Sequence, residues 1–240
     1  MEDRRWKPRG RSKIPMSGAF QMQNSQRDPL VFAKMAGAGN DFVMIDGRSA
    51  AIGDAAGFAR RVCTRRLSVG ADGLIVVESS TRATFRIRYY NADGSHGEFC
   101  GNGTRCAARF AFLEGIAERR MTIETDAGIV NAEVLADDRV TISLPPPQAF
   151  RAERPVVVGG KSVRGSSITV GVPHYVIFTE GDLWQQDVET PGRAIRRSGE
   201  MQPAGTNVNF VAVRDTNAIE VRTYERGVEA ETMACGSGVV

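Results

Sequence analysis

The sequence has no run of 18 or more apolar residues, which is about the length that a membrane-spanning helix requires. Its N-terminus also lacks the apolar stretch of roughly 7 to 15 residues found in a secretory signal. These two absences predict a cytoplasmic protein with no membrane partner. With 240 residues, 42% of them hydrophobic, the chain is nevertheless long enough to bury one large core or two smaller ones.

Most of the chain also lacks an excess of positive charge. The net charge is +3, but residues 1–29 hold seven Lys or Arg against three acids, which leaves 24 basic and 25 acidic residues beyond them. A nucleic-acid-binding fold needs a basic patch and aromatic residues that stack on bases, and neither is found here. We therefore expect no nucleic-acid partner. Residues 1–29 show no helical or strand periodicity and are predicted to be a disordered basic extension.

Potential metal ligands and disulfide partners are few and irregularly spaced. The four cysteines include no Cys-x-x-Cys pair, and the two histidines, His96 and His174, do not complete a ligand pattern with them. A reducing compartment also disfavours a disulfide framework. We expect neither a metal site nor structural disulfides.

Short β-rich segments separated by glycine turns dominate the sequence after residue 30, which predicts a mixed sheet with few helices. Residues 104–115 have apolar residues at helical spacing and end on Gly115, as a helix does. The triplet Pro145, Pro146 and Pro147 can continue neither a helix nor a central strand. It predicts a boundary between one half over residues 30–146 and a second half over residues 147–240.

The two halves contain an internal repeat. Four positions of the segment ATFRIRYYN map onto positions of AIEVRTYE at a constant offset of 134. One inserted residue then aligns Cys100 with Cys235, and each cysteine is followed by Gly-x-Gly. Each half is thus predicted to build a strand, a turn with a polar residue, and a loop whose cysteine begins a helix. Two such units imply pseudo-twofold symmetry across a cleft. The paired positions are Phe85 and Ile219, Ile87 and Val221, Tyr90 and Tyr224, and Asn91 and Glu225.

A cysteine at a helix start faces unpaired backbone N–H groups and the positive end of the helix dipole, which favours its thiolate. The flanking glycines let backbone N–H groups approach an anion such as a carboxylate. Two such thiols on opposite sides of one carbon can remove a proton from one face and deliver a proton to the other, which is racemase or epimerase chemistry. Cys63 and Cys106 lie within helical runs and are interpreted as buried structural residues.

Other polar residues have both an ordinary and a functional interpretation. His174 follows a β-rich run and is either a core histidine or a group that tunes a thiol. Glu225 and Arg226 are either a surface ion pair or site residues, and their place at the repeat position of Asn91 favours the site. Asn40 in GAGND could simply satisfy a turn.

At these residues the sequence resembles the diaminopimelate epimerase family. The matching segments run from about residue 30 to the end of the chain. They are GAGNDFVMID, ADGLIVV, YYNADGSHGEFCGNGTRC, TDAG, GVPH, GTNVNFV and YERGVEAETMACGSG. The resemblance implies an α/β (α+β) fold of two pseudo-symmetric halves, each a mostly antiparallel sheet wrapped around a central helix, with the active site between them.

The family reaction is the cofactor-independent interconversion of LL- and meso-diaminopimelate, on the route to lysine and peptidoglycan. The resemblance implies that Cys100 and Cys235 are the acid/base pair, with His174 assisting Cys100 and Glu225 assisting Cys235. It also implies a homodimer. The implied substrate contacts are Asn40, Asn91, Gly101, Asn102, Asn207, Glu225, Arg226, Gly236 and Ser237.

The sequence departs from the family pattern at a few positions. Ala36 stands where the family often has histidine, Val172 where many members have a substrate-contacting asparagine, and Gly73 where some have a glutamine contact. Glu229 and Ala230 replace the single glycine usual in ERGxGET. The chain stops at Val240, where the helix after Cys235 should begin, so we expect a truncated and less active enzyme.

Two alternatives to diaminopimelate epimerisation stay open at this point. One is a related two-cysteine racemase acting on proline, hydroxyproline or another amino acid. The other is an inactive truncated relative that only binds a ligand. Arg226 and the asparagines favour a substrate with a polar, amino-acid-bearing far end, whereas a proline pocket should be smaller and more apolar.

Overall fold

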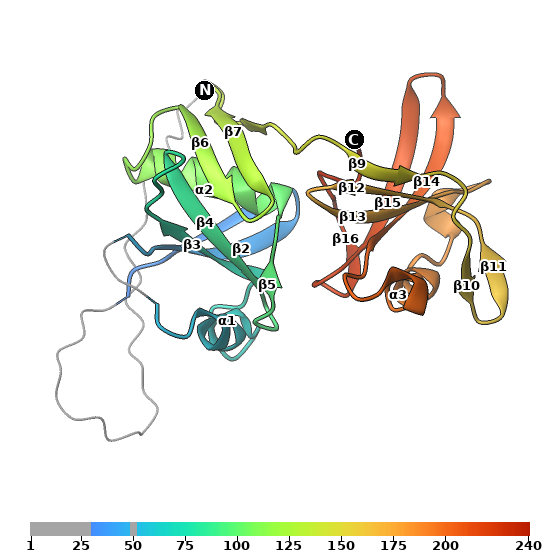
Figure 1. Ribbon diagram of the computed structural model, residues 1–240. Coiled ribbons are helices and arrows are strands. Elements are labelled where there is room, and N and C mark those ends of the chain that lie inside the picture. The colour runs from blue at the N-terminus through green and yellow to red at the C-terminus, as the bar shows by residue number, and fades with distance from the viewer. Residues whose placement is uncertain (1–29, 49–51) are drawn as a thin grey trace, which may run out of the picture.

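The structure is a computed structural model that describes residues 30–48 and 52–240. Two sheets follow one another along the chain and lie side by side (Figure 1). The predicted basic extension, residues 1–29, lies outside the described residues. No helix in the described ranges is both long enough and apolar enough to cross a membrane.

The first sheet has eight strands, in the order β1-β2-β3-β4-β6-β7-β8, with β5 pairing with β4. Its inward residues Ile75, Phe85 and Ile123 are fully buried in a core that includes Ala107 and Ala111 of α2. The opposite face packs against α1. The elements are β1 (Ala33–Gly37), β2 (Asn40–Asp46), α1 (Ala55–Cys63), β3 (Gly73–Glu78), β4 (Phe85–Asn91), β5 (His96–Gly97), α2 (Gly101–Leu113), β6 (Arg120–Thr125), β7 (Gly128–Val134) and β8 (Val140–Ile142).

The second sheet has six strands, in the order β16-β15-β14-β13-β12-β9, and β10 and β11 form a separate hairpin. Buried Phe210 and Tyr224 lie in one core with Ile195 of α3. The elements are β9 (Gln148–Arg151), β10 (Val156–Val158), β11 (Lys161–Val163), β12 (Ser166–Val170), β13 (Val172–Phe178), the 3-10 turn η1 (Leu183–Gln185), α3 (Glu189–Arg196), the 3-10 turn η2 (Gly199–Met201), β14 (Asn207–Asp215), β15 (Ala218–Glu225) and β16 (Ala230–Thr232).

The face of the second sheet away from α3 is more exposed than the matching face of the first sheet. In the first sheet α2 covers the inward residues of β4, such as Phe85, which is 0% exposed. The matching residue of β15, Ile219, is 54% exposed, and Val213 opposite it on β14 is 62% exposed. Within the described ranges Cys235 starts only a turn, closed by a hydrogen bond of 3.1 Å from Gly238 N–H to the Cys235 carbonyl.

The internal repeat is visible in the strand pairing. β1 and β2 are antiparallel, β2 and β3 parallel, and β3 and β4 antiparallel, and the series β12, β13, β14 and β15 repeats this order. Tyr90 pairs with His96 on β5, and its counterpart Tyr224 pairs with Glu231 on β16. The extra residue of the second copy is absorbed at Glu229, which adopts a left-handed backbone with φ of 59°.

The proline triplet lies between β8, the last strand of the first sheet, and β9, the first strand of the second. We therefore propose that residues 30–146 and 147–240 are the two halves of the molecule. The helix α3 was not predicted, because its sequence ETPGRAIR contains Pro191 and Gly192. Gly192 is needed there because a Cβ atom would lie 2.6 Å from the Tyr224 Cβ.

The buried aromatic side chain of Phe85 provides a test of the first core. Phe85→Ala should lower the free energy of unfolding by about 3–5 kcal/mol, since it removes a large apolar side chain and leaves a cavity. Phe150→Ala is the matched control, because Phe150 is 65% exposed and its truncation should cost far less. Urea unfolding measures both, and equal losses in the two variants would contradict this description of the core.

Candidate active site

A cleft of about 300 Å³ is lined by residues of both sheets. The first half contributes the ends of β4 and β5 and the start of α2, and the second half contributes the end of β15 and the loop around Cys235. Most of the predicted site residues line it together. They are Asn91, Cys100, Gly101, Asn102, Asn207, Glu225, Arg226, Cys235, Gly236 and Ser237.

Cys100 is the N-cap residue of α2, as its position before Gly-x-Gly predicts. Its Sγ accepts a hydrogen bond from the Gly103 N–H, at 3.4 Å. A Cβ atom on Gly103 would lie 2.8 Å from the end of the Ile75 side chain of β3, so a larger residue would require that side chain to move. The first turn of α2 therefore lies directly on the sheet, and the Cys100 side chain is only partly exposed towards the cleft.

Cys235 lies on the opposite side, in the loop after β16, and is buried. Its Sγ is 3.7 Å from the Ser237 Oγ. Glu225, at the end of β15, lines the cleft with Cys235, and its Oε1 accepts from the Thr232 Oγ1 at 2.7 Å. The assistance of Cys235 by Glu225 stays a prediction.

The start of α2 favours the Cys100 thiolate as expected, through the Gly103 N–H, but burial outweighs this effect. Burial raises the pKa of the Cys100 thiol to about 12, although the Gly103 N–H acts in the opposite direction. Burial, together with the Glu225 charge, also raises the pKa of Cys235 to about 12. Removing a charged sulfur from water costs more than one backbone hydrogen bond restores. A charge on Cys235 raises the Cys100 pKa further, so the two thiols are electrostatically coupled.

His174 lies at the base of the Cys235 loop. Its Nδ1 is 2.9 Å from the Asn209 Oδ1 and its Nε2 is 3.0 Å from the Ser237 Oγ. The Asn209 carbonyl oxygen can only accept, so Nδ1 carries the proton and Nε2 accepts from the Ser237 hydroxyl. Burial lowers the pKa of His174, which favours this neutral form. The hydrogen bonds of His174 in this conformation thus lead towards Cys235, not towards Cys100.

Three of the predicted asparagines differ in where they lie relative to the cleft. Asn91 lines the cleft and accepts from the Tyr89 hydroxyl at 2.6 Å. Asn102 also lines it and donates to the Ala234 carbonyl at 2.9 Å, which joins the two cysteine loops. Asn40 is buried behind Asn102 and accepts from its amide at 2.8 Å.

Arg226 joins the two halves at the other end of the cleft. Its guanidinium donates to the Ala204 carbonyl at 2.7 Å and approaches the Glu98 carboxylate at 3.4 Å. The Asn207 Oδ1 accepts from the Arg226 backbone N–H at 2.8 Å, which fixes the turn that carries Arg226. The Glu98 carboxylate thus lies beside one nitrogen of the Arg226 guanidinium.

Several lining residues were not predicted. Tyr89 orients Asn91, Glu98 pairs with Arg226, and Arg196 pairs with Glu229 at 3.0 Å. Tyr89 had a usable signal, since it alternates with Phe85 and Ile87 on the buried face of β4. Glu98 and Arg196 had none, because their partners are 128 and 33 residues away along the chain.

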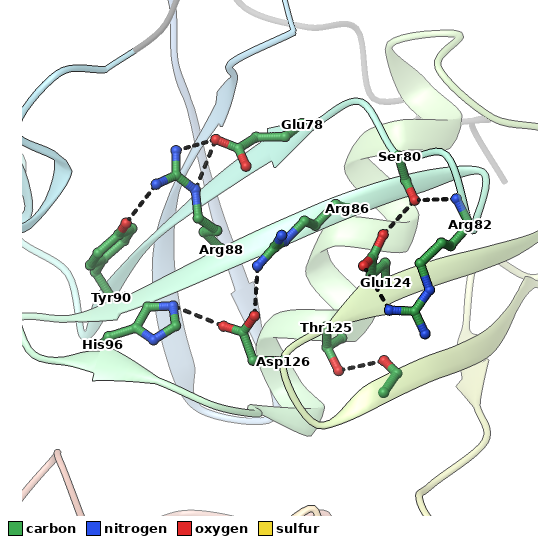
Figure 2. Close-up of polar contacts among 11 residues, drawn as sticks. Glu78, Ser80, Arg82, Arg86, Arg88, Tyr90, His96, Glu124, Thr125 and Asp126 are labelled. Atoms are coloured by element: carbon green, nitrogen blue, oxygen red, sulfur yellow. Dashed lines mark hydrogen bonds and ion pairs between the residues drawn. The ribbon is translucent and has the colours of Figure 1, made fainter.

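Polar side chains of β4 and its neighbours form a network around Asp126 (Figure 2). Asp126, in the turn after β6, is 2.7 Å from the Arg86 guanidinium and 2.9 Å from the His96 Nε2. His96 begins β5, which leads directly to Glu98 and Cys100. Asp126 thus ties the short strand before the cysteine loop to the body of the first sheet.

Two departures from the family pattern have structural explanations. A Cβ atom on Gly73 would lie 2.7 Å from the Tyr90 carbonyl oxygen, so this position has no room for a larger side chain. Val172 is buried beside Phe99 and offers the cleft only apolar surface. In the described residues, no group of three or more His, Cys, Asp or Glu side chains is arranged as a metal site.

The raised thiol pKa values predict slow alkylation that accelerates with pH. Cys100 and Cys235 should react with iodoacetamide more slowly than cysteine in the urea-unfolded chain, and the rate should rise roughly tenfold per unit between about pH 8 and pH 10. The sign follows because the thiolate reacts and its fraction grows with pH until the pKa is reached. Mass spectrometry of cysteine peptides measures both rates. A plateau below about pH 8 would contradict the assigned burial effect.

Comparison with known proteins agrees with the motifs. A family model described as diaminopimelate epimerase matches residues 32–149 and 166–240. The diaminopimelate epimerase of Aquifex aeolicus is 44% identical over 220 residues, which cover 87% of this chain and 78% of that protein. The diaminopimelate epimerase of Archaeoglobus fulgidus is 42% identical over 225 residues, which cover 88% and 79%.

Solved structures share the architecture at much lower identity. A probable proline racemase from Agrobacterium radiobacter superimposes with a TM-score of 0.68 at 15% identity, covering 86% of this chain and 74% of that one. A hydroxyproline epimerase from Agrobacterium vitis gives 0.63 at 16% identity, covering 87% and 73%. These likenesses show the two-sheet α+β fold alone. From the family match and the identity of its relatives, the chain belongs to the diaminopimelate epimerase family of isomerases.

Proposed function

We propose that this protein interconverts LL- and meso-diaminopimelate, without a cofactor, through a two-cysteine acid/base mechanism. The observation that carries the proposal is that Cys100 and Cys235, one from each half, line the same cleft. The names of the relatives support the substrate, because diaminopimelate epimerases share up to 44% of their residues with this chain over most of its length.

In the proposed reaction the substrate α-carbon lies between the two sulfur atoms. One thiolate removes the α-proton from one face, and the thiol on the other side donates its proton to the opposite face of the resulting carbanion. One C–H bond breaks and one forms, so the centre inverts and the charge moves from one sulfur to the other. The roles of Cys100 and Cys235 exchange when the direction of the reaction reverses.

The substrate α-carboxylate would lie against the backbone of the two cysteine loops. The first N–H groups of α2, at Gly101 and Asn102, have no partner within the helix and point towards an anion at its N-terminus. Gly236 and Ser237 occupy the equivalent place after Cys235. Hydrogen bonds to the carboxylate stabilise the carbanion as charge moves into it, in a site from which bulk water is excluded.

The far end of diaminopimelate carries a second amino acid group, and the other end of the cleft offers matching polar partners. Arg226 can pair with the distal carboxylate, while Asn91, Asn207 and Glu225 supply hydrogen-bonding groups around the distal ammonium. Glu225 would serve a second role beside Cys235. We retain the assistance of Cys100 by His174 as a prediction, although its present hydrogen bonds lead to Ser237.

The remaining proposals follow from the family. We propose a role in the formation of lysine and peptidoglycan precursors, a location in the cytoplasm, and a homodimer. Sedimentation analysis of the purified chain would measure its oligomeric state directly.

Isotope exchange in deuterium oxide tests the reaction. Purified protein given LL-diaminopimelate under reducing conditions should incorporate deuterium at the α-carbon and form the meso isomer. Cys100→Ala and Cys235→Ala should each lower the rate by about 10²–10⁴-fold, because each removes one proton-transfer group. Cys106→Ala is the matched control, since this thiol lies within α2 and does not line the cleft. Equal losses in all three variants would contradict the assignment.

The substrate assignment needs its own comparison. The rate with LL-diaminopimelate should exceed the rates with L-proline and trans-4-hydroxy-L-proline by at least about 10²-fold, since Arg226 and the asparagines would lack partners on a proline ring. Exchange on proline alone would favour the racemase alternative. Protection of Cys100 from alkylation by diaminopimelate, with no exchange on any substrate, would favour the alternative that only binds a ligand.

A further inference from the structure

A chain of hydrogen bonds runs from the edge of the first sheet to the Cys235 loop. The Asp72 Oδ2 accepts from the Asn40 Nδ2 at 3.1 Å. The Asn40 Oδ1 then accepts from the Asn102 Nδ2 at 2.8 Å, and the same nitrogen donates to the Ala234 carbonyl at 2.9 Å. Asn40 and Asn102 are 6% and 3% exposed, so water competes little for these groups.

Each asparagine amide in this chain has a defined direction. An amide can be flipped by exchanging its oxygen and nitrogen, and the two orientations offer opposite hydrogen-bonding partners. A carboxylate can only accept, so Asp72 requires the nitrogen of Asn40 on its side and leaves the Asn40 oxygen facing Asn102. At the other end the Arg105 guanidinium, which can only donate, bonds to the Asn102 Oδ1. The Asn102 nitrogen therefore faces both Asn40 and Ala234.

Asp72 is itself held in place by several contacts. It precedes β3, where this strand runs parallel to β2, and its Oδ2 also accepts from the Asp41 backbone N–H at 3.1 Å. Its Oδ1 pairs with Arg65 at 2.8 Å. These contacts leave the Asp72 carboxylate in a fixed position at the edge of the sheet.

We propose that Asp72 is a positioning residue for both cysteine loops, acting by fixing the direction of the Asn40 amide, whose oxygen holds the Asn102 nitrogen while Arg105 holds the Asn102 oxygen. Its carboxylate touches neither thiol and does not line the cleft. Asn102 lies at the start of α2 beside Cys100, and its amide nitrogen donates to the Ala234 carbonyl just before Cys235. Asp72 therefore acts on both cysteine loops through Asn102. Loss of Asp72 lets Asn40 turn its nitrogen towards the Asn102 nitrogen. Asn102 then loses one of the contacts that hold its amide, and the side chain that bonds to Ala234 is held less firmly, by Arg105 alone.

The activity test of this proposal depends on the proposed function. Asp72→Ala should lower kcat more than it raises KM, since the distance between the thiols is disturbed more than substrate binding. The double variant Asp72→Ala with Asn40→Ala should be no slower than Asn40→Ala alone, because Asp72 acts through Asn40. Independent, multiplying losses would overturn the proposal. Asp46→Ala is the matched control, since it removes a carboxylate from the far end of the neighbouring strand β2.

A second measurement does not require activity. Asp72→Ala and Asn102→Ala should each raise the alkylation rate of Cys235 by about fivefold, the factor expected from one lost hydrogen bond. Cys106 serves as the reference thiol in the same molecules, and Asp46→Ala should leave both rates unchanged. A faster Cys235 in Asn102→Ala but not in Asp72→Ala would overturn the proposal. If the wild-type protein shows no epimerisation, the proposed function fails, and the alkylation rates still decide whether Asp72 positions the loops.

Discussion

The hydrogen bond from the Asn102 amide to the Ala234 carbonyl joins the two cysteine loops across the cleft. Cys100 and Cys235 belong to separate halves, and among the residues that the structure describes no strand pairing joins the two sheets. The relative position of the two thiols is therefore set by contacts across the cleft, of which the 2.9 Å bond to Ala234 lies nearest to both cysteines in sequence. The ion pair between Arg226 and Glu98 makes a second connection at the opposite end.

The burial of these contacts has a consequence for the chemistry. The same exclusion of water that strengthens the hydrogen bonds raises the pKa of both thiols to about 12. A C–H group is a weak acid, so a strongly basic thiolate, whose thiol has a high pKa, accepts its proton more readily. The same high pKa lowers the fraction of molecules that carry the thiolate. In this site a thiolate is therefore costly to form but strongly basic once it has formed.

The repeat explains why two cysteines reach one cleft at all. Each is preceded by the same sequence of a parallel strand pair, an antiparallel long strand and a short returning strand, so each half delivers its cysteine at the same edge. The second copy accommodates an extra residue at Glu229, whose left-handed backbone costs about 1 kcal/mol or more for a residue with a Cβ atom. Its carboxylate is held by Arg196 and by the Gly227 N–H, and these bonds offset that cost.

The sequence by itself determined the local elements and the local chemistry. Short β-rich segments between glycine turns predicted the strands, Gly115 the end of α2, and Cys-Gly-x-Gly the capping of α2 by Cys100, because these features depend on residues within one turn or one strand. The match of motifs determined the family, and most of the site residues that it predicted do line the cleft. By contrast α3 was missed, since its Pro and Gly disfavour a helix in isolation and Tyr224 stabilises it only by packing.

Only the tertiary structure decided the state of the thiols and the partners of the buried polar groups. The dipole at the start of α2 is a local effect that predicts a low thiol pKa, whereas desolvation depends on everything folded around the sulfur and reverses the sign. In the same way the bonds of His174 to Ser237, of Arg226 to Glu98, and of Asp72 to Asn40 join residues far apart in the chain. No local pattern encodes such contacts, because their energy appears only when the sheets and loops are in place.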